Sequence, residues 1–126
     1  MMHNIYQEIL MDHYKNPRNR GHVSHYSFIA EQRNSSCGDE IVCSGIIAHD
    51  ILQDIRFEGK GCVISQATAS LLSERVKGRS VQDICLINKD DLSTMIGMQL
   101  GPVRMQCALL SLIALSDGIN KHKRAQ

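Results

Sequence analysis

The length and composition of this 126-residue chain allow one domain with a single modest core. Its 14 Lys and Arg residues nearly balance its 13 Asp and Glu residues, and the net charge of +1 offers no electrostatic footprint for a nucleic-acid duplex or an anionic membrane. Trp is absent, and 2 Phe and 3 Tyr residues are too few for a base-stacking surface. No apolar run could span a membrane and no signal-peptide pattern opens the sequence, so we expect a cytoplasmic protein.

The first half of the chain predicts one helix followed by three strands. Residues 4–15 have helical apolar spacing, and the helix should end at residues 16–17, because a residue before proline is disfavoured in the helical region. Residues 26–33, 40–48 and 51–58 read as strands, the last with clear alternation of apolar and polar side chains. These three segments predict an antiparallel meander.

The second half predicts four helices, over residues 62–77, 80–87, 90–96 and 103–119. The basic residues that follow place a frayed tail at about 121–126, and we treat residues 1–126 as a single domain. A run of strands followed by a run of helices is typical of an α+β fold with the helices packed on one face of the sheet.

Five cysteines carry most of the chemical information: Cys37, Cys43, Cys62, Cys85 and Cys107. An odd number of widely spaced thiols, with no export signal, argues against a disulfide framework. Cys43 and Cys85 lie among apolar residues, where a thiol commonly serves as a small hydrophobic core residue. We therefore expect both to be buried.

The other three cysteines lie in sequence settings that are compatible with metal binding or thiol reactivity. Cys37 falls in a loop of turn-forming residues, and Asp39, two residues later, either caps that turn or adds a carboxylate ligand. Cys62 follows two glycines and opens a helix, where free backbone amides and the helix dipole favour a thiolate. For Cys107, near the start of the last helix, core packing and metal binding are almost equally well supported.

Three thiolates and one carboxylate would suit zinc or iron–sulfur chemistry, although their spacing lacks the C-x-x-C pattern of a zinc knuckle. The glycines do not form a phosphate loop, because Ile64 stands where the third glycine of G-x-G-x-x-G belongs. The histidines show no i,i+4 pairing; His49 suits a turn and the others suit exposed positions.

Four segments resemble the IscU/SufU/NifU N-terminal family of iron–sulfur cluster assembly scaffolds: residues 11–19 (MDHYKNPRN), 34–39 (NSSCGD), 57–65 (FEGKGCVIS) and 103–110 (VRMQCALL). The resemblance extends from residue 4 to about 119. It implies an N-terminal helix, a three-stranded antiparallel sheet and a helical C-terminal half. It also implies that Cys37, Asp39, Cys62 and Cys107 converge as ligands of a cluster or metal ion.

Two departures separate the chain from the chaperone-dependent IscU type. Gln106 stands where that type has a histidine before the last cysteine, and residues 100–104 read LGPVR where it has Leu-Pro-Pro-Val-Lys. Both count against recognition by a dedicated Hsp70-type chaperone. The N-terminal segment and residues 57–65 resemble the zinc-binding SufU branch more closely, but the extra segment typical of that branch before the last cysteine is missing.

The resemblance implies a carrier rather than an enzyme. Such a scaffold accepts sulfur from a cysteine desulfurase, binds iron, and transiently holds a [2Fe–2S] cluster that it transfers to acceptor or carrier proteins. Cys37, Cys62 and Cys107 are the possible sulfur acceptors. The alternative is a SufU-like, zinc-dependent sulfur acceptor that activates the desulfurase, and a third interpretation is a structural zinc domain without a transfer role.

Overall fold

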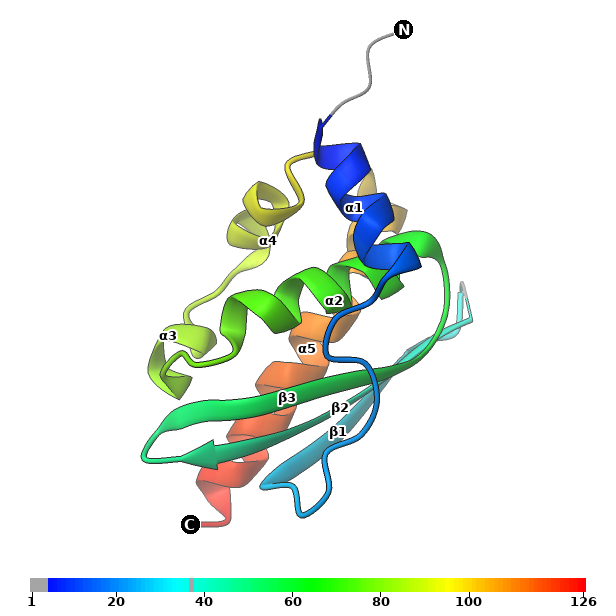
Figure 1. Ribbon diagram of the computed structural model, residues 1–126. Coiled ribbons are helices and arrows are strands. Elements are labelled where there is room, and N and C mark those ends of the chain that lie inside the picture. Colours follow the sequence, from blue (N-terminus) through cyan, green and yellow to red (C-terminus); the bar gives the residue numbers. More distant parts are fainter. Residues whose placement is uncertain (1–4, 37) are drawn as a thin grey trace, which may run out of the picture.

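A computed structural model describes residues 5–36 and 38–126 and has an N-terminal helix, a three-stranded sheet and four further helices (Figure 1). The elements are α1 (Ile5–Lys15), β1 (Phe28–Asn34), β2 (Asp39–Ala48), β3 (Ile51–Lys60), α2 (Val63–Val76), α3 (Val81–Cys85), α4 (Lys89–Ile96) and α5 (Pro102–Arg124). This order confirms the predicted α+β fold. Within the described ranges, the helices are too short or too polar to cross a membrane.

The sheet is an antiparallel meander in the order β1-β2-β3, as predicted. β1 pairs with β2 from Phe28 opposite Gly45 to Asn34 opposite Asp39. The β2–β3 hairpin turns at His49 and Asp50, whose φ angles of 54° and 60° are those that a two-residue type I′ turn requires. β3 continues two residues beyond the predicted strand, to Lys60, which places the end of the sheet next to Cys62.

One face of the sheet is covered by α2 and α5, while α1 packs against α2 (Figure 1). Alternate strand residues such as Ile41 and Ile55 are fully buried and belong to one core cluster with Leu72 of α2 and Leu115 of α5. Burying a side chain of this size contributes roughly 1.5–3 kcal/mol. This core holds the start of α2 and the start of α5 near the same end of the sheet.

The ring of Phe28 fixes α5 against the sheet. A Cβ atom on Gly118 of α5 would lie 2.3 Å from Cδ2 of Phe28, and one on Gly45 of β2 would lie 2.7 Å from its Cε1. Real Cβ atoms do not approach other atoms this closely, so a larger residue at either position would have to displace the Phe28 ring. The helix and the two strands therefore meet around one aromatic ring.

The last helix is longer than predicted. α5 runs to Arg124, so the basic residues from Lys121 onward form its final turn instead of a frayed tail. Lys and Arg are good helix formers, and positive charge is favourable at a helix C-terminus. The buried residues Gly118 and Ile119 also anchor the turn that precedes this basic run.

Residues 16–21 connect α1 to the free edge of β3. The backbone amide of Phe57 donates to the carbonyl of Asn19 at 2.9 Å, and that of Gly21 donates to the carbonyl of Phe57 at 2.9 Å. On the other side, the Arg18 amide donates to Oγ of Ser70 on α2 at 2.8 Å. This segment is therefore held between β3 and α2.

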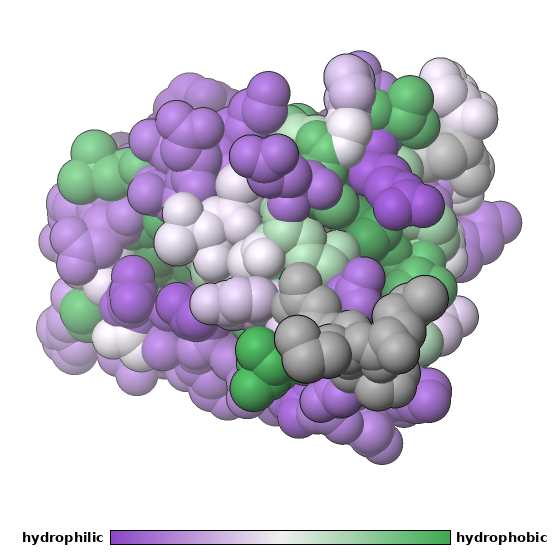
Figure 2. Space-filling model, turned by 90° about the horizontal axis from the view of Figure 1, so that it is seen from above, coloured by the Kyte–Doolittle hydropathy of each residue, from purple (hydrophilic) through white to green (hydrophobic). Residues whose placement is uncertain are grey.

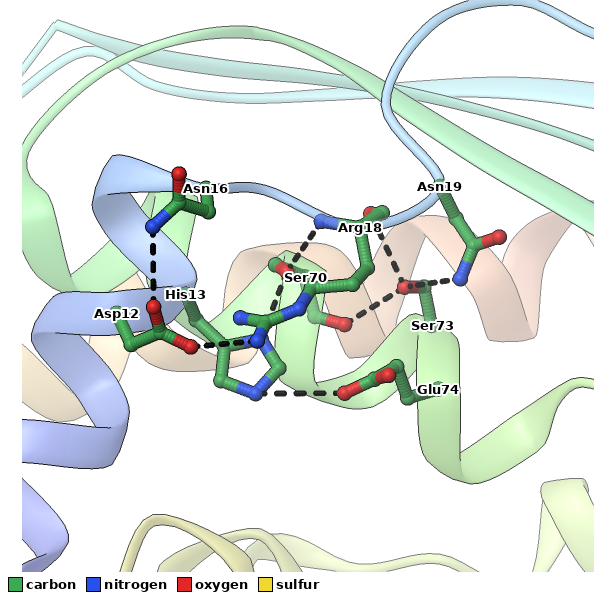
Figure 3. Close-up of polar contacts among 8 residues, drawn as sticks. All are labelled: Asp12, His13, Asn16, Arg18, Asn19, Ser70, Ser73 and Glu74. Carbon is green, nitrogen blue, oxygen red and sulfur yellow. Dashed lines mark hydrogen bonds and ion pairs between the residues drawn. The ribbon is translucent and has the colours of Figure 1, made fainter.

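His13 is buried at the centre of this connection, so the expectation that it is exposed was wrong (Figure 3). Its Nδ1 lies 2.8 Å from Oγ of Ser70, and its Nε2 lies 3.4 Å from Oε1 of Glu74. Because Ser70 already accepts the Arg18 amide, its hydroxyl is free to donate to Nδ1, which leaves the proton of the neutral ring on Nε2. Burial and, after it, the Arg18 guanidinium lower the pKa of His13.

Candidate metal centre

Three of the four predicted ligand residues converge in the structure. A carboxylate oxygen of Asp39 and the Sγ atoms of Cys62 and Cys107 all lie within 4.8 Å of one another. They come from the start of β2, the residue before α2 and the second turn of α5. Cys37, the fourth predicted ligand, lies outside the described residues.

Asp39 is completely buried and orients Cys62. Its Oδ1 accepts a hydrogen bond of 2.8 Å from the backbone amide of Cys62, and its Oδ2 accepts a longer contact of 3.5 Å from Sγ of Cys62. A carboxylate removed from water needs such partners to compensate for its lost hydration. Asp39 is therefore a strand residue that reaches across to the helix start, rather than the turn former of the alternative interpretation.

The approach of Asp39 to residue 62 depends on glycine. Gly61 has φ +155°, and a Cβ atom there would lie 2.2 Å from Oδ1 of Asp39. Gly59 has φ +144°, and its Cβ would lie 2.0 Å from the carbonyl oxygen of Glu40. Because only glycine fits such contacts, these two residues let the loop after β3 close over the start of β2.

Cys62 caps the N-terminus of α2. Its Sγ accepts from the backbone amide of Ser65 at 3.5 Å, and Oγ of Ser65 donates to the carbonyl of Cys62 at 3.1 Å. The sulfur therefore takes the place of the side-chain oxygen that usually accepts from the first free amides of a helix. The role of the buried Ser65 was not predicted from the sequence, although its place three residues after a cap residue is the usual spacing of this contact.

Exposure distinguishes the two cysteines of the site. Cys62 is exposed, whereas Cys107 is buried on the inner side of α5. Gln106, beside Cys107 in sequence, is exposed. A molecule arriving from solvent therefore meets Cys62 first.

Cys43 is buried in the middle of β2, as predicted, and burial raises the pKa of its thiol. It stays protonated and does not act as a metal ligand. Cys85 was predicted to be buried and is exposed. Val81 and Ile84 of the short helix α3 are buried, whereas Cys85 is its last residue and lies at the surface, where Nζ of Lys123 is 3.7 Å from its Sγ.

The donor atoms fit a tetrahedral metal ion. Zinc binds sulfur at about 2.3 Å and carboxylate oxygen at about 2.0–2.2 Å, which sets sulfurs in one coordination sphere roughly 3.8 Å apart. Separations up to 4.8 Å need only small side-chain movements to reach this geometry. Soft thiolates also select iron–sulfur clusters, so the same residues suit either centre.

Apolar surface borders the site. A hollow of about 450 Å³ lies between α1, the start of α2 and Met98, and Val63, which directly follows Cys62, is part of its wall. Apolar side chains gather on this upper face among polar ones (Figure 2). The exposed thiol therefore stands next to surface that a protein partner could cover.

The combination of this fold with a carboxylate–thiol cluster defines a small metal- or cluster-binding domain. A family model for the NifU-like N terminal domain matches residues 5–126. The chain therefore belongs to the NifU-like N-terminal domain family, which confirms the predicted resemblance.

Individual relatives cover nearly the whole chain. It is 34% identical to the zinc-dependent sulfurtransferase SufU of Bacillus subtilis, over 94% of this chain and 92% of that protein. It is 30% identical to the iron-sulfur cluster assembly scaffold protein IscU of Thermotoga maritima, over 95% and 96%. A crystal structure from Fervidobacterium islandicum, described as an iron-sulfur cluster assembly scaffold for the SUF system, superposes with a TM-score of 0.77 at 27% identity, over 91% of this chain and 96% of the other.

Proposed function

We propose that this protein is an iron–sulfur cluster assembly scaffold. It accepts sulfur from a cysteine desulfurase, binds iron, and transiently holds a [2Fe–2S] cluster that it passes to acceptor proteins. The observation that supports this function best is the cluster of Asp39, Cys62 and Cys107, one thiol exposed and two groups buried, in a chain of this family. Cys37 completes the proposed ligand set.

Sulfur enters by thiol–persulfide exchange at Cys62. The Cys62 thiolate attacks the terminal sulfur of a persulfide on the desulfurase, a new S–S bond forms on Cys62, and the desulfurase cysteine leaves as a thiolate. The step is redox-neutral, because one S–S bond replaces another. The exposed position of Cys62 and the helix N-terminus behind its sulfur favour this role over the buried Cys107.

Asp39 provides a ligand from which the bound cluster can be released. A stable [2Fe–2S] protein offers four thiolates, and a carboxylate in place of one is a harder and more exchangeable ligand for iron. Three thiolates and one carboxylate carry four negative charges, so a [2Fe–2S]²⁺ core or a Zn²⁺ ion leaves the same net charge of about −2. The site can therefore exchange one centre for the other without a change in charge.

Anaerobic reconstitution tests this function. The full chain is incubated with ferrous iron, cysteine, a cysteine desulfurase and a thiol reductant, which supplies the electrons that convert persulfide sulfur to sulfide, and the visible absorption of the cluster is recorded. We expect the wild type and Cys85→Ala to develop the absorption, and Cys62→Ala and Cys107→Ala to lose most of it. Equal absorption in all four proteins, or none in the wild type, would contradict the proposal.

A second candidate is a zinc-dependent sulfur acceptor that activates the desulfurase. It is favoured by the 34% identity to SufU of Bacillus subtilis and by a donor set that fits tetrahedral zinc. Bound zinc would hold the ligands in position and stabilise the Cys62 thiolate. Desulfurase turnover with and without the zinc-loaded chain separates the two, because only this second function requires zinc for stimulation.

A structural zinc domain is the third possibility. If zinc held the fold together, a chelator would unfold the chain, as in zinc fingers. We expect the far-ultraviolet circular dichroism to survive chelation, since the core is built by the sheet, α2 and α5.

The reduced thiols of the site suit the reducing cytoplasm, where we propose that the protein works with its desulfurase and its cluster acceptors.

A further inference from the structure

A second hollow, of about 450 Å³, lies beside the metal centre and has no part in the function described so far. Its floor is formed by buried residues of β2, β3 and α2, among them Ile41, Phe57 and Ser70. Its rim is formed by the end of α1, residues 17–20 and the loop that closes β3. This volume is typical of sites for small molecules.

The rim of this hollow is cationic although the chain as a whole is nearly neutral. Lys15, Arg18, Arg20 and Lys60 line it, against a single carboxylate, that of Glu58. Arg18 is paired with Asp12. Within the described ranges, Lys15, Arg20 and Lys60 have no carboxylate within ion-pairing distance, so the hollow carries an excess of positive charge.

The charged residues are held by different parts of the fold. Lys15 ends α1, Lys60 ends β3 opposite Glu40, and Arg20 forms a bridge to Phe57 at the free edge of β3. The segment that carries Arg20 is itself fixed to α2 through the Ser70 contact shown in Figure 3. Because these elements are packed together, the positions of the charges are set before a ligand arrives.

We propose that this hollow binds a small polyanion, a phosphate or a polycarboxylate. Such a ligand matches the size of the hollow and its excess of positive charge, and arginine can donate two parallel hydrogen bonds to either kind of oxyanion. A large duplex or a membrane surface does not match a concave site of this volume.

The position of the hollow links this ligand to the metal centre. Gly59, Lys60 and Gly61 form one wall, and Gly61 precedes Cys62 and is the residue at which a Cβ atom would collide with Asp39. A polyanion that draws Lys60 toward itself therefore restrains the loop that presents the exposed thiol. Its binding and its location are measurable without any cluster or desulfurase.

Titration calorimetry at low salt tests the proposal, with inorganic phosphate and tricarballylate as probes and glycerol as the uncharged control. The full chain is compared with Arg20→Gln, Lys60→Gln and the matched control Arg124→Gln, which removes an exposed arginine far along α5. We expect each pocket variant to weaken binding by about fivefold and the control to leave it unchanged. The tighter of the two probes identifies the phosphate or the polycarboxylate as the preferred class.

Changes in amide chemical shifts locate the binding site of the probe. We expect a bound probe to shift the resonances of Gly59, Lys60 and Gly61 together with those of residues 18–21. Absence of binding heat, equal weakening in Arg124→Gln, or shifts spread over the surface would overturn the proposal. Because neither readout involves iron, sulfur or a partner, its failure would leave the proposed scaffold function untouched.

Discussion

The backbone amide of Cys62 donates a 2.8 Å hydrogen bond to Oδ1 of Asp39, so one proposed ligand of the site positions another. Asp39 thus has two roles that mutagenesis can separate. As a ligand it holds the cargo through oxygen, and as an acceptor it holds the loop before α2.

We expect Asp39→Ala to lengthen the lifetime of a bound [2Fe–2S] cluster, because it removes the exchangeable oxygen ligand and leaves the thiolates. It should also lower the free energy of unfolding by about 1–2 kcal/mol, since the Cys62 amide loses its acceptor. The decay of visible absorption in air and during transfer to an apo-acceptor gives the lifetime. Asp39→Asn keeps an oxygen for the amide and should be the more stable variant. Faster decay in Asp39→Ala would refute the labile-ligand role.

Gly61→Ala should disturb the site directly. Its Cβ would lie 2.2 Å from Oδ1 of Asp39, so the carboxylate or the loop must move. The matched control is Gly78→Ala, which also has positive φ but open space around its Cβ. We expect the control to cost about 1–2 kcal/mol of backbone strain, and Gly61→Ala to cost about 1–3 kcal/mol more and to lower zinc per chain. Urea denaturation and metal analysis measure both; equal losses in the two variants would contradict the contact.

The pH dependence of stability should contain a contribution from His13. Because its pKa is lowered in the folded state, the unfolded chain binds this proton more readily, and the free energy of unfolding falls as the pH falls through about 6.5. His13→Gln should flatten the dependence between pH 7 and pH 5, whereas His122→Gln, on the last turn of α5, should retain it. Urea titrations at several pH values give the slopes. An unchanged slope in His13→Gln would show that the buried ring does not titrate in this range.

Thiol accessibility should separate the two cysteines outside the site. In the native chain we expect iodoacetamide to modify Cys85 and to spare Cys43 until the protein unfolds, because one is exposed and the other is buried with a raised pKa. Cys85→Ser should change stability by less than about 0.5 kcal/mol and leave metal content unchanged. Peptide mass spectrometry identifies the modified residues, and early labelling of Cys43 would count against its burial.

Gln106→Ala should leave metal stoichiometry unchanged. The side chain is exposed, and a neutral amide is a much weaker donor to zinc or iron than imidazole or thiolate. Cys107→Ala, the neighbouring substitution, should lose metal in the same measurement. Loss of metal from Gln106→Ala would make the glutamine a ligand.

The secondary structure was largely predictable, because apolar spacing and turn residues mark its elements. α2 was predicted over residues 62–77 and spans Val63–Val76, and the hairpin turn at His49 and Asp50 falls where expected. The end of α5 was missed because a basic run can be a solvated tail or a favourable last turn, and sequence spacing does not distinguish them.

The errors at Cys85 and His13 have a different cause. Apolar neighbours in sequence do not decide burial at the end of a short helix: Val81 and Ile84 of α3 are buried, whereas Cys85, its last residue, is exposed. His13 is buried because both of its ring nitrogens have polar partners. Its Nδ1 lies against Oγ of Ser70, which is 57 residues away, and its Nε2 lies against Oε1 of Glu74. For the site, the glycines and the helix start indicated Cys62, but the buried contact between Asp39 and its amide depends on a loop closure that no local pattern describes.

The packing of Phe28 against Gly118 fixes the position of α5 along its axis, and with it the position of Cys107 in the metal centre. Gly118 and Cys107 lie on one continuous helix, so whatever fixes the first also fixes the second. A slip of α5 by one residue would move Cys107 by about 1.5 Å along the axis and turn it by about 100°, away from Cys62 and Asp39. The aromatic ring at the far end of the sheet thus helps to set the distance between the sulfur atoms of Cys62 and Cys107. Substitutions at Phe28 or Gly118 should therefore alter metal affinity, although neither residue is a ligand.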